Sequence, residues 1–79
     1  MELEEAFKEF RESMLSSMIS FCRDEEAAED GVSHAFTQAL VHRQMLEAMH
    51  PAAMRAWLYS AGRNSIIDMK RKETSLSVV

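Results

Sequence analysis

Residues 51–72 have the sequence PAAMRAWLYSAGRNSIIDMKRK. This segment contains both a signal for the start of a helix and apolar side chains at helical spacing. Pro51 suits the first turn of a helix, because its missing N–H would have no partner there. Apolar or small residues then recur three or four positions apart, a period typical of a helix with one packed face. The stripe consists of Met54, Leu58, Ala61, Ser65 and Met69, with Trp57 and Ile66 beside it. The pattern predicts an amphipathic helix over this segment.

The opposite arc of this predicted helix holds the only concentrated positive charge in the sequence. Its polar and basic residues are Arg63, Asn64, Lys70, Arg71 and Lys72, with Asp68 among them. The chain has a net charge of −4, but residues 1–50 sum to −7 and residues 51–79 to +3. Because electrostatic steering depends on where charge lies, the basic arc predicts a surface that meets nucleic acid. The simpler alternative is that the last three basic residues only complement the dipole at the carboxyl end of a helix.

Two more helices are predicted ahead of this segment. The first runs from Glu2 to about Phe21, with apolar side chains three or four residues apart. Its apolar face comprises Leu3, Phe7, Phe10, Met14, Met18 and Phe21, widened by Leu15, Ile19 and Cys22, and both Phe7 and Phe10 are expected in the core. Asp24 is a good N-cap for the second helix, which is predicted to extend to about His42 or as far as Met49. Its buried face is expected to be Ala28, Val32, Ala35, Phe36, Ala39 and Leu40.

A glycine, a connector and a change of pattern near the end of the chain complete the predicted domain. Gly31 lies mid-helix at a cost of about 1 kcal/mol against alanine, which indicates close packing or a functional reason. The connector around residues 46–50 is rich in methionine, so we expect it to be partly buried or to contact a partner. After Lys72 the sequence ETSLSVV loses periodicity, which is typical of a frayed tail or the start of a linker. The prediction is therefore an all-α domain over residues 1–72, a small three-to-four-helix bundle, followed by a tail over residues 73–79.

Several classes of protein are disfavoured by composition and spacing. The acidic amino terminus is not a signal peptide, no apolar run reaches the roughly 20 residues of a membrane span, and Cys22 has no internal partner for a disulfide. These features indicate a soluble cytoplasmic protein. His34, His42 and His50 are eight residues apart, which is not the spacing of helical metal ligands, and no glycine-rich phosphate loop is present. Cys22 lacks a base partner and is expected as a buried structural thiol, so we expect no enzyme, metal or cofactor.

A polar stripe is predicted on the second helix. Asp30, Ser33, His34 and Thr37 fall at i, i+3, i+4 and i+7, so they share one face. By periodicity alone the simplest interpretation is a solvated face.

Two stretches of the sequence resemble a known family. These are D-E-E-A-A-E-D-G-V-S-H-A-F (residues 24–36) and A-W-L-Y-S-A-G-R-N-S-I-I-D-M-K-R-K (residues 56–72). They are similar to region 2 of bacterial RNA polymerase sigma factors of the sigma-70 family, most of all the extracytoplasmic-function (ECF) group. That group has roughly A-E-D-[LI]-V-Q-E-x-F, a connector, and then W-L-x-x-I-A-R-N-x-x-x-D-x-x-R-R. Both halves occur in the right order and at suitable spacing over residues 24–72.

The resemblance implies two binding functions and no catalysis. The second helix would dock on the clamp coiled coil of the largest catalytic subunit of RNA polymerase, through Asp30, Ser33, His34 and Thr37. The last helix would capture the non-template strand of the −10 promoter element and help to open the duplex, through Arg63, Asn64, Lys70, Arg71 and Lys72. The connector over residues 46–53 would shape a pocket for a flipped base, whose lost stacking energy of a few kcal/mol the site must offset. An anti-sigma factor is a further partner that the family leaves open.

The sequence also departs from the family pattern. Gly31 stands where leucine or isoleucine is usual, Ser33 and His34 replace glutamine and glutamate, and Ala61-Gly62 replaces isoleucine-alanine. An acidic anchor is therefore missing from the expected polymerase-binding stripe, which leaves Asp30 as its main charge. His34 would make docking sensitive to pH near neutrality.

Alternatives remain open at this stage. Trp57 is expected in the core or half-buried, although an indole near this position could stack a base; Tyr59 is expected to be exposed, with no assigned role. A helical protein–protein module without DNA binding is the main competing function. A helix-turn-helix operator binder would need a tight turn that the methionine-rich connector does not resemble. Nothing in the sequence corresponds to the second helical domain of sigma factors, which reads the −35 element. We therefore expect either a fragment of a longer factor, which the end of the chain after Lys72 favours, or a partial protein that does not select promoters unaided.

Overall fold

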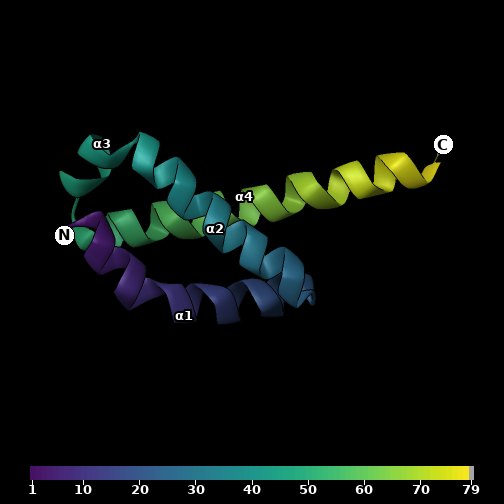
Figure 1. The fold of residues 1–79 in the computed structure, drawn as a ribbon, viewed down its shortest axis with the longest axis horizontal. Helices are drawn as coiled ribbons and strands as arrows, with labels where there is room; N and C mark the ends of the chain where they lie inside the picture. Colours follow the sequence, from purple (N-terminus) through teal and green to yellow (C-terminus); the bar gives the residue numbers. More distant parts are fainter. Residues whose placement is uncertain (79) are drawn as a thin grey trace.

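In the computed structural model, the described residues of the chain fold into four helices (Figure 1): α1 (Leu3–Cys22), α2 (Glu25–Val41), α3 (Arg43–Glu47) and α4 (Pro51–Val78). The structure describes the backbone of residues 1–78 and the side chains of residues 1–72. α1 and α4 run in the same direction, and α2 runs back from the end of α1 to α3 and crosses α4 on the way. The carboxyl-terminal part of α4 projects beyond the other helices. No strand occurs in the described part of the chain, and the predicted all-α bundle is confirmed.

Local sequence sets the end of α1 and the starts of α2 and α4. Arg23 adopts a left-handed conformation (φ 57°) that ends α1, and its N–H donates to the carbonyl of Ile19 at 2.7 Å. The Asp24 carboxylate then accepts a hydrogen bond from the Ala27 N–H at 3.2 Å, so it caps α2 as predicted. α4 begins at Pro51, also as predicted.

The second helix is shorter than its longest predicted extent. α2 ends at Val41, and α3 follows as a separate short helix before the connector. Leu46 of α3 is completely buried and Met49 is half-buried, so the predicted partial burial of the connector is confirmed.

α3 is tied to the start of α1 by one carboxylate. Glu47 accepts hydrogen bonds from the backbone N–H of Leu3 at 2.7 Å and from Nε of Arg43 at 3.1 Å. The Arg43 guanidinium also pairs with Glu4 of α1. Glu2, the N-cap residue of α1, makes no side-chain capping bond, so a residue 44 positions away in the sequence satisfies one of the free N–H groups of this helix.

These carboxylates predict a loss of stability in acid. The Leu3 N–H, followed by Arg43, holds the pKa of Glu47 below its usual 4.5, and the Ala27 N–H, followed by Lys70, holds the pKa of Asp24 below its usual 3.8. A carboxyl group with a lowered pKa in the folded state stabilises the protein fully above the unfolded pKa, and that contribution is lost as pH falls through the folded pKa. We expect the free energy of unfolding, measured in urea, to fall below about pH 4.5. The fall should be smaller in Glu47→Gln; an equal fall in that variant would exclude Glu47 as a contributor.

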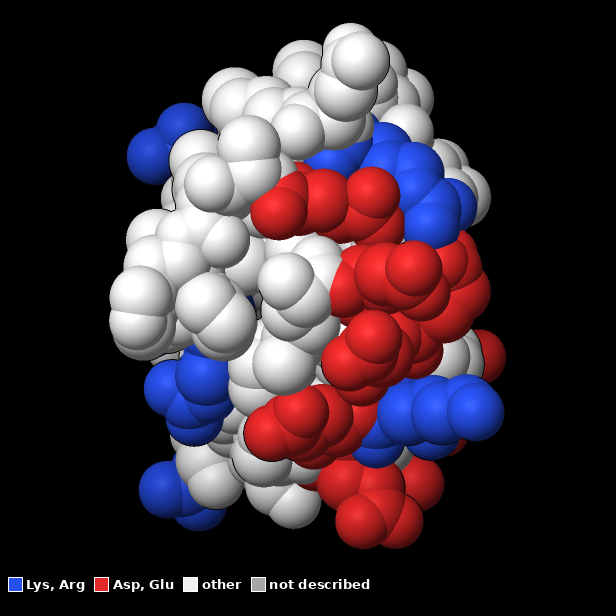
Figure 2. Space-filling view, turned by 90° about the vertical axis from the view of Figure 1, so that its left-hand side faces the viewer, with Lys and Arg blue, Asp and Glu red and all other residues white. Residues whose placement is uncertain are grey.

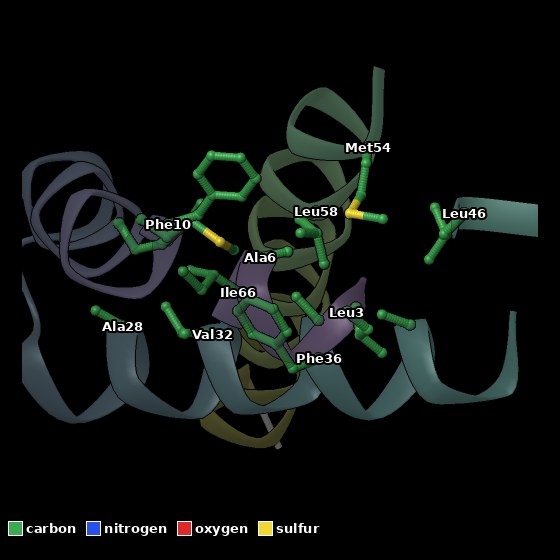
Figure 3. Close-up of a cluster of buried hydrophobic side chains, with 14 residues drawn as sticks. Leu3, Ala6, Phe10, Ala28, Val32, Phe36, Leu46, Met54, Leu58 and Ile66 are labelled. Carbon is green, nitrogen blue, oxygen red and sulfur yellow. The ribbon is translucent and has the colours of Figure 1, made fainter. Parts of the chain in front are cut away.

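The core draws on all four helices. Its completely buried large side chains are Met14, Met18, Leu46, Met54, Leu58 and Ile66. Figure 3 shows side chains of this cluster pointing into the space between the helices. On α4 the buried positions are Met54, Leu58, Gly62 and Ile66, spaced four apart, whereas Ala61, Ser65 and Met69 are only half-buried. The predicted apolar stripe was therefore wrong in its second half, where it followed Ala61, Ser65 and Met69. The buried face instead continues through Gly62 and Ile66, so Ile66 lies within this face rather than beside it.

Three side chains that were expected to be buried are partly or largely exposed. Phe7 and Leu40 are 45% and 60% exposed, and Cys22 is only half-buried, with its thiol donating to the Asp24 carbonyl at 3.3 Å. Phe21, on the predicted apolar face of the first helix, is 48% exposed. The helical period gives the direction of a packed face, but the neighbouring helices cover only its centre. Phe10, at 8% exposed, is in the core as predicted.

The two glycines of the chain meet where α2 crosses α4. A Cβ added to Gly31 would lie 2.8 Å from Cγ1 of Ile66 and 3.2 Å from the carbonyl oxygen of Gly62. A Cβ added to Gly62 would lie 3.2 Å from Cε of Met18. The predicted close packing at Gly31 is therefore confirmed, and the two departures from the family pattern at these positions are one feature of the helix crossing.

α4 does not end where the sequence predicted. Its backbone continues as a helix to Val78, so the expected frayed tail after Lys72 is wrong for the described backbone. The side chains of residues 73–79 lie outside the described part of the structure. Their assignment to the start of an interdomain linker stays a prediction.

Candidate functional site

The polar stripe predicted on α2 is exposed along its whole length, but its members border two different hollows. Asp30, Ser33, His34 and Thr37 are all exposed. Ser33 and Thr37 border a groove between α1 and α2, whereas His34 borders a hollow between α2 and α4. The Thr37 hydroxyl donates to the Ser33 carbonyl at 2.9 Å, so its own hydrogen is already used.

The groove between α1 and α2 has a volume of about 540 Å³ and a mostly apolar lining. Its residues are Leu3, Glu4, Phe7, Lys8, Ser33, Phe36, Thr37 and Leu40. Phe7 packs edge-to-face on Phe36, with ring centroids 5.0 Å apart, and Leu40 also contributes to the apolar lining. Sequence reasoning missed this groove because it assigned Phe7 and Leu40 to the core. The available signal was their position at the edge, not the centre, of each apolar stripe.

The basic residues of α4 do not form one patch. Arg63, Asn64, Arg71 and Lys72 are exposed, whereas Lys70 is half-buried. Residues seven apart share a face of a helix, so Arg63 lies with Lys70, and Asn64 lies with Arg71. Lys70 forms an ion pair with the Asp24 carboxylate at 3.1 Å, and Lys72 borders the hollow that also contains His34. Of this set, Asn64 and Arg71 form the pair on the outer face of the helix.

Two aromatic residues flank the buried stripe of α4. Trp57 is half-buried, as predicted, and packs edge-to-face on His42 with ring centroids 5.8 Å apart. Tyr59 is half-buried rather than exposed, because its hydroxyl bonds to Ser13 of α1 at 2.9 Å. The Arg55 guanidinium lies 4.4 Å from the centre of the Tyr59 ring and donates to its hydroxyl at 3.1 Å.

The connector before α4 is anchored rather than open. Leu46 is completely buried, and the His50 ring accepts a hydrogen bond from the Ala52 N–H at 3.1 Å, which caps the start of α4. Met45 is 47% exposed and is the large apolar side chain of this region that a ligand can reach. The pocket for a flipped base over residues 46–53 stays a prediction.

Residues 6–75 match the family model of Sigma-70 region 2. The chain belongs to the sigma-70 region 2 family. Comparisons with curated proteins and with solved structures found no match. Region 2 is a non-catalytic domain of sigma factors, so the chain has a sigma-factor role in transcription initiation, with RNA polymerase core and promoter DNA as its general partners. The match begins at residue 6 in α1 and ends at residue 75 in α4, so it covers α2 and α3 and most of α1 and α4.

The charge of the region 2 domain is unevenly distributed over its surface. In Figure 2, which views the end formed by α3 and the amino terminus, acidic side chains gather in a band on one side. Lys and Arg side chains lie along the opposite edge, across uncharged surface, and others lie next to the acidic band itself. The exposed glutamates of α1 and its N-cap contribute to the negative charge of the first 50 residues; they are Glu2, Glu4, Glu5, Glu9 and Glu12.

Two features associated with other functions are absent from the described residues. No group of three or more His, Cys, Asp or Glu side chains in this part of the chain is placed to hold a metal ion. No helix within the same residues is long and apolar enough to cross a membrane.

Proposed function

We propose that this region 2 domain joins RNA polymerase core to the −10 element of promoters, as part of an ECF-type sigma factor acting in the cytoplasm. The observation that carries the proposal is the family match over a domain whose α2 stripe and outer α4 face are both exposed. The two surfaces lie on different helices, so polymerase and DNA could bind at the same time. An anti-sigma factor would compete for one of them.

The clamp coiled coil of polymerase is the proposed partner of α2. Asp30 supplies negative charge for a basic side chain of the partner, and Ser33 and Thr37 form the border between the polar stripe and the apolar groove. Interfaces draw most of their affinity from a few buried apolar or aromatic anchors. The groove thus supports docking without the acidic anchor that the family pattern has beside Ser33.

The non-template strand of the −10 element is the proposed ligand of α4. Arg71 contributes salt-sensitive affinity for phosphate, and the Asn64 amide, on the same face, can read a base edge. Arg63 and Lys72 lie to either side of this face. Lys70 forms an ion pair with the Asp24 carboxylate. To contact DNA as proposed, the Lys70 ammonium must leave this carboxylate and bind a phosphate instead.

Co-purification with an isolated clamp coiled coil tests the polymerase half. We expect the wild-type domain to bind and the Asp30→Ala, His34→Ala variant to lose binding. Glu12→Ala removes an exposed acid from α1 and should bind as the wild type does. If none of the three proteins binds the coiled coil while all of them keep their helical content, the proposed docking face is contradicted.

Leu40 provides a second prediction for the same surface. Leu40→Ala should weaken coiled-coil binding by about tenfold, as for an apolar anchor worth about 1.4 kcal/mol. Its neighbour Val41 is more exposed and does not line the groove, so Val41→Ala should change affinity less than about twofold. Titration calorimetry measures both constants; equal effects of the two substitutions would exclude the groove.

A helical protein–protein module without DNA binding is the second candidate. The overall charge of −4 and the Asp24–Lys70 ion pair favour it. Only the first proposal requires an affinity for single-stranded DNA whose logarithm falls linearly with the logarithm of salt concentration. Binding that is absent at low salt would select the second candidate.

A further inference from the structure

A carboxylate from another part of the fold holds one lysine of α4. The ammonium of Lys70 lies 3.1 Å from Oδ2 of Asp24, which precedes α2 at the corner between α1 and α2, 46 positions earlier in the chain. Figure 1 shows that the carboxyl-terminal part of α4 projects beyond the other helices. The contact therefore ties the carboxyl-terminal half of α4 to the rest of the bundle.

The two oxygens of the Asp24 carboxylate have separate contacts. Oδ1 accepts the Ala27 N–H at 3.2 Å and so caps α2, whereas Oδ2 accepts from the Lys70 ammonium. Asparagine and serine cap helices about as well as aspartate does, so capping does not require the negative charge. The ion pair with Lys70 does require it. The bond to Lys70 is therefore separable from the local structure that Asp24 supports.

The ion pair is placed where another anion can replace the carboxylate. The side chains of Lys70 and Asp24 are 41% and 40% exposed, so solutes reach both groups. Ion pairs this exposed are weak and are screened by salt. A lysine ammonium is a compact charge on a flexible four-carbon stem, so it can turn from a carboxylate oxygen to a phosphate oxygen without a change in the backbone. The pair is thus suited to exchange.

We propose that Asp24 is an autoinhibitory group, whose carboxylate occupies Lys70 and lowers the affinity of the domain for DNA until a phosphate displaces it. The inference rests on the proposed function and adds a control of the α4 surface, not a further contact with DNA. Asp24 acts twice, because it neutralises Lys70 and repels phosphates that approach it. A strand already held by Arg71 presents its phosphates at high local concentration, so Lys70 joins the interface after the outer face has bound.

Fluorescence anisotropy with labelled oligothymidine at low salt tests the proposal through a gain of binding. Asp24→Asn keeps an oxygen for the cap and loses the charge, so it should bind about two- to fivefold more tightly than the wild type, the range for an exposed ion pair. The slope of log affinity against log salt should steepen by about 0.7, as for one more phosphate contact on a single strand. The matched control is Glu25→Gln, which makes the same change of charge at the adjacent, exposed residue and should gain much less.

Removal of the lysine identifies the cause of the gain. With Lys70→Met already present, Asp24→Asn should give no further gain beyond that of Glu25→Gln. A gain that persists without Lys70, or an equal gain in Glu25→Gln, would show an effect of net charge and would overturn the proposal.

The outcomes also separate this proposal from the function on which it rests. If the wild type binds oligothymidine and Asp24→Asn binds no more tightly, autoinhibition is overturned and the −10 function is not. That function is judged by the loss of promoter-strand binding in Asn64→Ala and Arg71→Met. If the wild type does not bind but Asp24→Asn does, autoinhibition is supported in its strongest form. If neither protein binds at low salt, both proposals are overturned.

Discussion

Gly31→Leu should destabilise the domain by about 3 kcal/mol, although it restores the residue type that the family pattern has at this position. The first added carbon alone would lie 2.8 Å from Ile66 and 3.2 Å from the Gly62 carbonyl, so α2 and α4 must separate to admit a larger side chain. Helix propensity opposes this loss by about 1 kcal/mol or less. Urea denaturation followed by circular dichroism measures the difference.

Two further variants identify the cause of this expected loss. Gly31→Ala adds only the Cβ, and its propensity gain of about 1 kcal/mol should roughly cancel the displacement of the Ile66 side chain. Combining Gly31→Leu with Ile66→Ala makes room for the leucine, so the double variant should lose less stability than the sum of the single changes. Strict additivity, or a stable Gly31→Leu single variant, would show that the helices do not cross as closely as the two glycines indicate.

Leu58→Ala should cost about 2–5 kcal/mol, because it removes three carbons from a completely buried position and leaves a cavity. A core of this size supplies only about 3–5 kcal/mol, so the variant should be largely unfolded at room temperature. Leu40→Ala is the matched control, since it makes the same chemical change at a side chain that is 60% exposed. Its effect on stability should be about 0.5 kcal/mol or less. Similar losses in the two variants would contradict the assignment of Leu40 to an open groove.

The local features of the fold were accessible from the sequence because they depend on neighbouring residues. Asp24 has the side chain for capping α2, Pro51 suits the start of a helix, and a glycine within a helix indicates close contact. The structure confirms each of these. What the sequence did not reveal is the partner of that glycine, because Gly62 lies on another helix.

The errors have a common physical origin. A helical period shows which way a face points, but not how much of that face its neighbours cover, and Phe7 and Leu40 lie just beyond the covered part. The same limit hid the Asp24–Lys70 ion pair and the contact of Glu47 with α1, both of which join residues more than 40 positions apart. As a result, sequence analysis grouped five residues of α4 into one DNA surface, whereas the structure distributes them around the helix.

The central claim is that this domain binds RNA polymerase core and DNA at the same time. A capture experiment with the domain, polymerase core and DNA together tests it most directly. Random single-stranded DNA is immobilised, and retention of polymerase core is measured at fixed salt with and without the region 2 domain. We predict that core retention rises when the domain is added and returns to background with either Asp30→Ala, His34→Ala or Asn64→Ala, Arg71→Met. Core retention that the wild-type domain does not increase would contradict the claim that this domain joins the two partners.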